Sequence, residues 1–380
     1  MGTLKIVFIP NLPYTYRDHE RFGVKYFIDK GYDVEVLDIH KILIPGYKEK
    51  VKIDYWTFDL HIEVENKCDL LNKIKSLKAN DFIFFYIAGG DANILLHEMR
   101  KVTKAKFITY MGGSIPDSTE PCGIVNNMKL FMYMLIRKIM IKKVFSTDYY
   151  VSGSKKDEII FSDLIGKKTK VIQSHSRDYN LCLSTKGYKH DAPYCVFLDT
   201  DVINASDYEL FDIKAEKNIE NYLKKLIIFF KWIEENFRVD VIIAAHPKSR
   251  IYLHKDNIDG IKIVHSQSSA LVKNSEFVIN EGTTAVSYAI FFKKPLFFFT
   301  LSEISFFQHT CSFAKALDKN IINIDRVTFS TYKEIVNELK NYQSYEKYKK
   351  NYLTYADNKI STFDLINDIF KNYKVVENGT

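Results

Sequence analysis

A short polar segment in the second half of the chain combines an acid, a glycine and two hydroxyl groups. Glu281, Gly282, Thr283 and Thr284 follow the apolar run 277–279, and the helix-like sequence AVSYAIFF comes next. One threonine could simply cap that helix. Backbone N–H groups at a helix start, together with hydroxyls and a glycine, also form a site for an anion. The segment therefore predicts either a helix cap or a phosphate site.

Another polar segment follows the apolar run 239–244. His246 stands two residues after the end of that run, and Lys248, Ser249 and Arg250 follow in the sequence AAHPKSR. A single histidine in such a place is commonly a structural residue. Cationic and hydrogen-bond-donating groups so close together favour a phosphate ligand instead.

Two further hydroxyls, Ser268 and Ser269, begin another predicted helix between these segments. A strand-end histidine, a serine pair and a threonine pair in this order are more specific than any one of them. Together they predict one anion-binding site.

The elements that must position these residues are short apolar runs separated by helix-length spacers. The expected strands are 6–9, 34–37, 82–87, 107–110, 149–151, 171–173, 194–198, 239–244, 261–264, 277–279, 296–299 and 321–324. Continuous apolar strands with helical spacers are typical of parallel sheets covered on both faces. Ligands of such sheets bind beyond the carboxyl ends of the strands, where the polar segments lie. We expect an α/β protein with two Rossmann-like domains, residues 1–180 and 190–335, and C-terminal helices in 336–380 that cross back to the first domain.

Composition excludes several other classes of protein. The chain has 380 residues, of which 46% are hydrophobic, and a net charge of +7, so large cores are expected and disorder is not. The charge is mild and no nucleic-acid-binding motif appears, so no nucleic-acid partner is predicted. Five cysteines without a CxxC pair indicate a cytoplasmic protein with reduced thiols.

No apolar run is long enough to span a membrane. Residues 128–145 are apolar and basic without an acid, which predicts either a buried helix or a helix lying on an anionic membrane surface.

The motifs of the second half resemble those of a known family. AAHPKSR, followed by LVKNSEFVINEGTTAVSYAIFFKKPLFFF, resembles the HP and Ser/Thr motifs of GT-B glycosyltransferases of the bacterial sialyltransferase-like and surface-polysaccharide type. Capsule transferases and CDP-glycerol polymer synthases share related patterns. The resemblance covers roughly residues 170–330 and implies a nucleotide-sugar-binding domain there.

The resemblance also implies roles for individual residues. His246 would contact the donor phosphate, and the threonine and serine pairs would surround it. The remaining expected donor-binding residues are Lys248, Ser249, Arg250, Glu281 and Gly282, with the acid on a ribose or sugar hydroxyl.

A GT-B fold would place the acceptor on the N-terminal domain, where an inverting enzyme needs a base. Asp91 in AGGDAN is the first candidate, although it could instead cap the following helix. Asp117 and Glu120 in a later loop come next, and are expected to line the cleft; Asp18 and His19 follow the first strand. The paired-acid motif of the sialyltransferases does not appear as a clear string.

Asp199 and Asp201 spell a DxD pattern, which binds Mg²⁺ or Mn²⁺ in GT-A transferases. Here the pattern opens a second series of strands, so we expect the two aspartates to line the cleft. Metal binding and helix capping are the alternatives.

The expected function is transfer of a sugar from a nucleotide donor to a surface-glycan or lipid-linked acceptor, without cofactor or metal. The preferred donor is a CMP-linked nonulosonic or Kdo-type acid sugar, and the expected location is the cytoplasm or the inner membrane face. Alternatives are a UDP- or GDP-sugar transferase, a CDP-alcohol phosphotransferase, a UDP-GlcNAc 2-epimerase-like enzyme, and a non-catalytic glycan- or nucleotide-binding scaffold.

Overall fold

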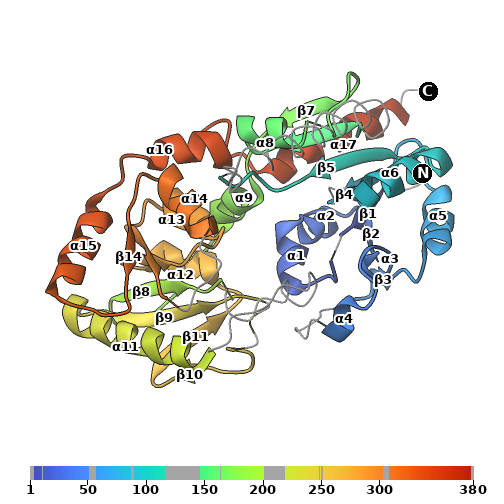
Figure 1. The fold of residues 1–380 in the computed structure, drawn as a ribbon. Coiled ribbons are helices and arrows are strands. Elements are labelled where there is room, and N and C mark those ends of the chain that lie inside the picture. The colour runs from blue at the N-terminus through green and yellow to red at the C-terminus, as the bar shows by residue number, and fades with distance from the viewer. Residues whose placement is uncertain are drawn as a thin grey trace, which may run out of the picture.

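The computed structural model describes residues 4–10, 12–50, 57–86, 90–116, 146–162, 164–200, 219–247, 249, 251–302 and 308–377. Within these residues the chain forms two parallel sheets that lie beside each other, each between layers of helices (Figure 1). This arrangement confirms the predicted α/β architecture of two Rossmann-like domains.

The N-terminal domain contains the first sheet, whose described strands run in the order β3-β2-β1-β4-β5-β6-β7. The strands are β1 (Lys5–Ile9), β2 (Asp33–Asp38), β3 (His61–Glu63), β4 (Phe82–Phe85), β5 (Lys106–Tyr110), β6 (Tyr149–Ser152) and β7 (Lys170–Gln173). Its helices are α1 (Tyr16–Arg21), α2 (Val24–Asp29), α3 (His40–Leu43), α4 (Tyr47–Lys50), α5 (Lys67–Lys75), α6 (Gly90–Val102) and α8 (Lys155–Ile160). Every pairing is parallel, and the strand order changes direction at β1.

The second sheet runs in the order β10-β11-β9-β8-β12-β13-β14 and changes direction at β8. Its strands are β8 (Tyr194–Leu198), β9 (Asp240–Ala245), β10 (Asn257–Ile258), β11 (Ile261–His265), β12 (Val278–Asn280), β13 (Leu296–Thr300) and β14 (Ile321–Asn323). The helices of this half are α9 (Arg177–Ser184), α11 (Ile219–Phe237), α12 (Ser268–Asn274), α13 (Val286–Phe291), α14 (Gln308–Ala316), α15 (Phe329–Lys340), α16 (Tyr345–Tyr348), the π-helix η1 (Lys349–Leu353) and α17 (Thr362–Glu377). Only the short β10 pairs antiparallel among the described strands.

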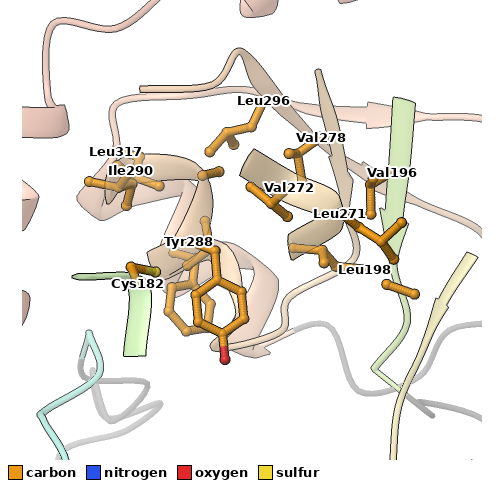
Figure 2. Close-up of a cluster of buried hydrophobic side chains, with 14 of the residues drawn as sticks. Cys182, Val196, Leu198, Leu271, Val272, Val278, Tyr288, Ile290, Leu296 and Leu317 are labelled. Carbon is orange, nitrogen blue, oxygen red and sulfur yellow. The ribbon is translucent and has the colours of Figure 1, made fainter. Parts of the chain in front are cut away.

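Alternating side chains of the strands enter cores on the two faces of each sheet. In β12, Val278 packs under α12 and α13, whereas Ile279 packs under α11 and α15. Side chains of a strand point to opposite faces in turn, so a strand covered on both faces must be apolar throughout. Figure 2 shows the first of these cores, with Val196, Val278 and Leu296 from three strands beside Leu271 and Val272 of α12.

The last helix lies against the N-terminal domain, although it follows the second sheet in sequence (Figure 1). The ring of Phe370 in α17 packs on Phe27 and Phe82, and Tyr32 donates a hydrogen bond to Asn367. These contacts tie the end of the described chain to its beginning.

The predicted strands agree with the structure except at two short ones. β3 and β10 have three and two residues and stand at sheet edges, and neither contains a continuous apolar run. Apolar periodicity therefore gave no signal for them.

Candidate functional site

The loop after β12 is shaped by Asn280. Its side-chain oxygen accepts hydrogen bonds from the backbone N–H of Gly282 at 2.5 Å and of Thr283 at 3.0 Å. The hydroxyl of Thr283 in turn accepts from the N–H of Ala285 at 3.3 Å. Thr283 therefore stabilises the turn that leads into α13. The neighbouring Thr284 is exposed, and neither its N–H nor its hydroxyl donates to any described residue.

Gly282 is required by the backbone of this loop. Its φ angle is +122°, and a Cβ atom there would lie 2.6 Å from the hydroxyl oxygen of Thr310. Side chains rarely adopt this conformation, so only glycine fits without rearrangement. Gly282 was predicted in the donor site, and its role there is to allow the backbone conformation of the loop.

The Glu281 side chain points into the C-terminal domain. Its carboxylate accepts hydrogen bonds from Tyr222 at 2.9 Å and Thr200 at 2.9 Å, and the residue is 1% exposed. Burial raises the pKa of Glu281 to about 8, against the effect of these two hydrogen bonds, and nearby Asp199 raises it further. Glu281 does not line the cavity, so the structure gives no support to direct contact with a ligand hydroxyl.

His246 stands where β9 ends, beside the switch point of the second sheet. Its backbone N–H donates to the carboxylate of Asp199 at 2.9 Å, and Asp199 is itself buried after β8. Asp199 therefore holds the His246 loop in place and also lines the cavity, as predicted. Ser249 is 4% exposed and does not line the cavity, so its predicted ligand contact lacks support.

The start of α12 provides the serine pair. Ser266, directly after β11, has a left-handed φ of +57°, and this turns the chain toward α12. Ser268 and Ser269 both face the cavity, and Ser269 accepts a hydrogen bond from Thr185 at 3.3 Å.

These segments surround one cavity of about 90 Å³ between the two domains. His246, Ser268, Ser269, Thr283 and Thr284 all line it, so the structure brings the predicted histidine, serine and threonine pairs together. The cavity adjoins a cleft of about 600 Å³ that reaches α2, α9 and α17, with Arg21, Leu181, Ser266 and Ser269 lining both.

Tyr288 and Asp178 form the floor of the cavity. The ring of Tyr288 belongs to the buried core under α13, and its hydroxyl lies at the edge of that cluster (Figure 2). The hydroxyl donates to Asp178 at 3.5 Å, which links α13 to α9.

The N-terminal wall of the cavity is made by two arginines that the sequence motifs did not reveal. Arg17 and Arg21 lie one turn apart on α1, the helix that faces the C-terminal domain (Figure 1). Arg21 pairs with Asp178 at 2.7 Å. Burial lowers the pKa of Arg21, but Asp178, together with Tyr288 and Asp18, keeps it above its usual value. The sequence does contain a signal for them, because two arginines spaced four apart share one face of the first helix after β1.

Arg177 lies behind this pair. Its guanidinium packs over Phe22, donates to the carbonyl of Met111 at 2.7 Å and closely approaches Gly112. Burial, followed by the charge of Arg21, lowers the pKa of Arg177 to about 10.

A buried carboxylate in the N-terminal domain holds the loop before α1. Asp38 at the end of β2 accepts from the N–H of Tyr14 at 3.0 Å and from the rings of His40 at 2.7 Å and His61 at 3.3 Å. Burial opposes its charge, but these hydrogen bonds keep the pKa of Asp38 below its usual value. The cluster thereby positions α1 and its arginines.

Several predicted site residues lie outside the described side chains: Asp91, Asp117, Glu120, Asp201, Lys248 and Arg250. The backbone of Asp91 is described and lies in the first turn of α6. Asp18 accepts from the N–H and hydroxyl of Thr15 and so caps α1, and the ring of His19 contacts Tyr14 at 3.2 Å. Neither of these two lines the cavity.

Within the described part of the chain, no group of three His, Cys, Asp or Glu side chains is placed to hold a metal ion. None of the helices described there has the length and apolar character needed to cross a bilayer.

Solved structures share this architecture. The wall teichoic acid polymerase TagF aligns over 98% of this chain and 90% of that chain, with 12% identity and a TM-score of 0.59. The UDP-GlcNAc 2-epimerase from Methanocaldococcus jannaschii aligns over 97% of this chain and 99% of that chain, with 12% identity and a TM-score of 0.50. No family model and no curated protein matches the sequence. Identities this low establish the fold, which is GT-B, and confirm the predicted resemblance at that level.

Proposed function

We propose that the protein is a glycosyltransferase that binds a nucleotide-activated sugar in the cavity between its domains. The observation that carries this proposal is the composition of that cavity. Hydroxyls and His246 from three loops of the C-terminal sheet stand on one wall, and two arginines stand on the other. Such a set of donors and cations suits a phosphate ester held at the carboxyl ends of parallel strands.

The proposed chemistry places the donor phosphate at the exposed Thr284 and beside His246. Negative charge grows on this phosphate as the glycosidic bond to it breaks. Donors already in place then stabilise the transition state more than the ground state. With a single phosphate as leaving group, the hydrogen-bond donors of the C-terminal wall would suffice, so we propose that no metal or cofactor is needed.

For the donor, we propose a CMP-linked acid sugar of the nonulosonic or Kdo type. The support is the sequence resemblance of the His246 and Thr283–Thr284 segments to sialyltransferase-like enzymes. A UDP- or GDP-sugar would bind the same wall with a second phosphate.

The proposed acceptor is a surface glycan, free or linked to a lipid. It would bind against the N-terminal domain, and Asp91 at the start of α6 is the proposed base. A lipid-linked acceptor would bring the enzyme to the membrane, for which residues 128–145, outside the described part, are the proposed contact. Salt-sensitive sedimentation with anionic but not neutral liposomes would support this contact.

The shared fold with TagF and with the 2-epimerase keeps two other reactions as rivals. A phosphotransferase would consume a CDP-alcohol and release CMP. A 2-epimerase would convert a UDP-sugar without any acceptor. A scaffold would bind a nucleotide and turn over none of these donors.

The test begins with calorimetric titration of the full-length protein with CMP, CDP, UDP and GDP. The proposal expects one of these to bind wild type and to bind Thr284→Ala more weakly, with unchanged affinity in Ser330→Ala, an exposed hydroxyl outside the cavity. Mass spectrometry of reactions with the corresponding activated sugars then separates transfer from epimerisation and from binding alone. Absence of nucleotide binding would refute the proposal.

A further inference from the structure

Arg17 and Arg21 differ in how their charges are balanced. Arg21 is neutralised by Asp178 at 2.7 Å, whereas Arg17 forms no ion pair or hydrogen bond with any described residue. The Arg17 side chain is exposed to solvent in the cavity, yet protein from both domains surrounds it. Burial and the charge of Arg21 lower its pKa.

The place of Arg17 is fixed by its surroundings. The N–H and the hydroxyl of Thr15 both donate to the carboxylate of Asp18 and so cap α1. The N–H of the preceding Tyr14 donates to Asp38. Arg17 thus projects from a fixed helix start toward the wall that carries Thr284 and His246. Because Arg17 is exposed in the cavity and has no ion-pair partner among the described residues, its guanidinium is available to an anionic group of a ligand.

We infer that Arg17 binds a second anionic group of the donor, distinct from the phosphate on the C-terminal wall. This inference rests on the proposed function and narrows its substrate class. The second anion is either the carboxylate of an acid sugar or the second phosphate of a nucleoside diphosphate. Both are flat or forked acceptors that a guanidinium binds with two parallel hydrogen bonds. Arg17 therefore determines specificity for doubly anionic donors.

The test compares ligands with one and two anionic groups. CMP, CMP-sialic acid, CDP and UDP are titrated into the full-length wild type, Arg17→Ala and Arg17→Lys. Lys75→Ala is the matched control, because Lys75 is an exposed cation on α5, outside both the cavity and the cleft.

Wild type is expected to bind at least one of the doubly anionic ligands about tenfold or more tightly than CMP, the size of one charge-assisted hydrogen-bonded contact. Arg17→Ala should lose this preference while its affinity for CMP changes little. Arg17→Lys should recover part of it, and Lys75→Ala should keep all of it. A preference for CMP-sialic acid identifies the carboxylate, and a preference for CDP or UDP identifies the second phosphate.

Two results would overturn the inference in distinguishable ways. If wild type binds none of the four ligands, the inference fails, and the proposed function fails with it when GDP does not bind either. If wild type binds CMP but Arg17→Ala retains the preference, or wild type shows no preference, only the role of Arg17 is refuted.

Discussion

Glu281, the buried acid in the loop between β12 and α13, should make the stability of the C-terminal domain depend on pH. Glu281 is 1% exposed and its pKa is raised from 4.5 to about 8, first by burial and then by Asp199. The folded state therefore favours the neutral acid, whereas the unfolded chain ionises near its usual pKa. Between these two values the folded state binds more protons, so stability falls as the pH rises.

The size of the effect follows from the two pKa values. Raising the pH from about 5.5 to about 8 should cost about 3 kcal/mol of unfolding free energy from this one group, at about 1.4 kcal/mol per unit of pKa shift. Glu281→Gln keeps an oxygen that accepts from Tyr222 and Thr200 but cannot ionise. As the pH rises over this interval, the unfolding free energy of the variant should therefore increase by about 3 kcal/mol relative to that of wild type.

The assay is thermal denaturation of wild type, Glu281→Gln and Glu276→Gln at both pH values. At about 2–4 °C per kcal/mol, the melting temperature of Glu281→Gln relative to wild type should rise by roughly 6–12 °C between the lower and the higher pH. Glu276 is exposed in the segment before β12, so its variant should follow wild type. Equal pH dependence in Glu281→Gln and wild type would refute the buried neutral acid.

Other changes to the loops of the site have distinct expected outcomes. His246→Ala should lower turnover by about 10²–10³ with an unchanged melting temperature, whereas His265→Ala, an exposed histidine at the end of the adjacent strand, should leave both near wild type. Normal turnover in the first variant would remove the histidine from the site. Thr284→Ala should weaken nucleotide binding by up to about tenfold, since one neutral hydrogen bond is lost, and unchanged calorimetric affinity would contradict this. Gly282→Ala should lower the free energy of unfolding by about 1–3 kcal/mol in thermal melts, because backbone strain and the close contact with Thr310 both oppose a Cβ atom there. Gly31→Ala is the control: its φ is +76° but no atom lies near the added Cβ, so it should cost less. Equal losses in the two variants would show that the contact with Thr310 is unimportant.

The sequence determined the sheets and the C-terminal wall of the cavity. Strands buried on both faces must be apolar along their whole length, so β8, β9, β12 and β13 could be located without coordinates. The rule that ligands bind at the carboxyl ends of such strands then selected His246 and the serine and threonine pairs. These are local properties of the chain. The strands β3 and β10 could not be predicted from local apolarity, because two or three residues at a sheet edge need not be apolar.

Only the tertiary structure decided which side chains face the ligand. The strand-end rule locates a loop but not the direction of each side chain, and Glu281 turned inward to Tyr222 while Thr284 stayed exposed. The strand-end rule also could not predict that Arg17 lines the cavity, because α1 reaches it by packing near α9 and the C-terminal domain, which lie far from α1 in the chain. Contacts across such separations depend on how whole domains pack, and no local pattern of residues encodes them.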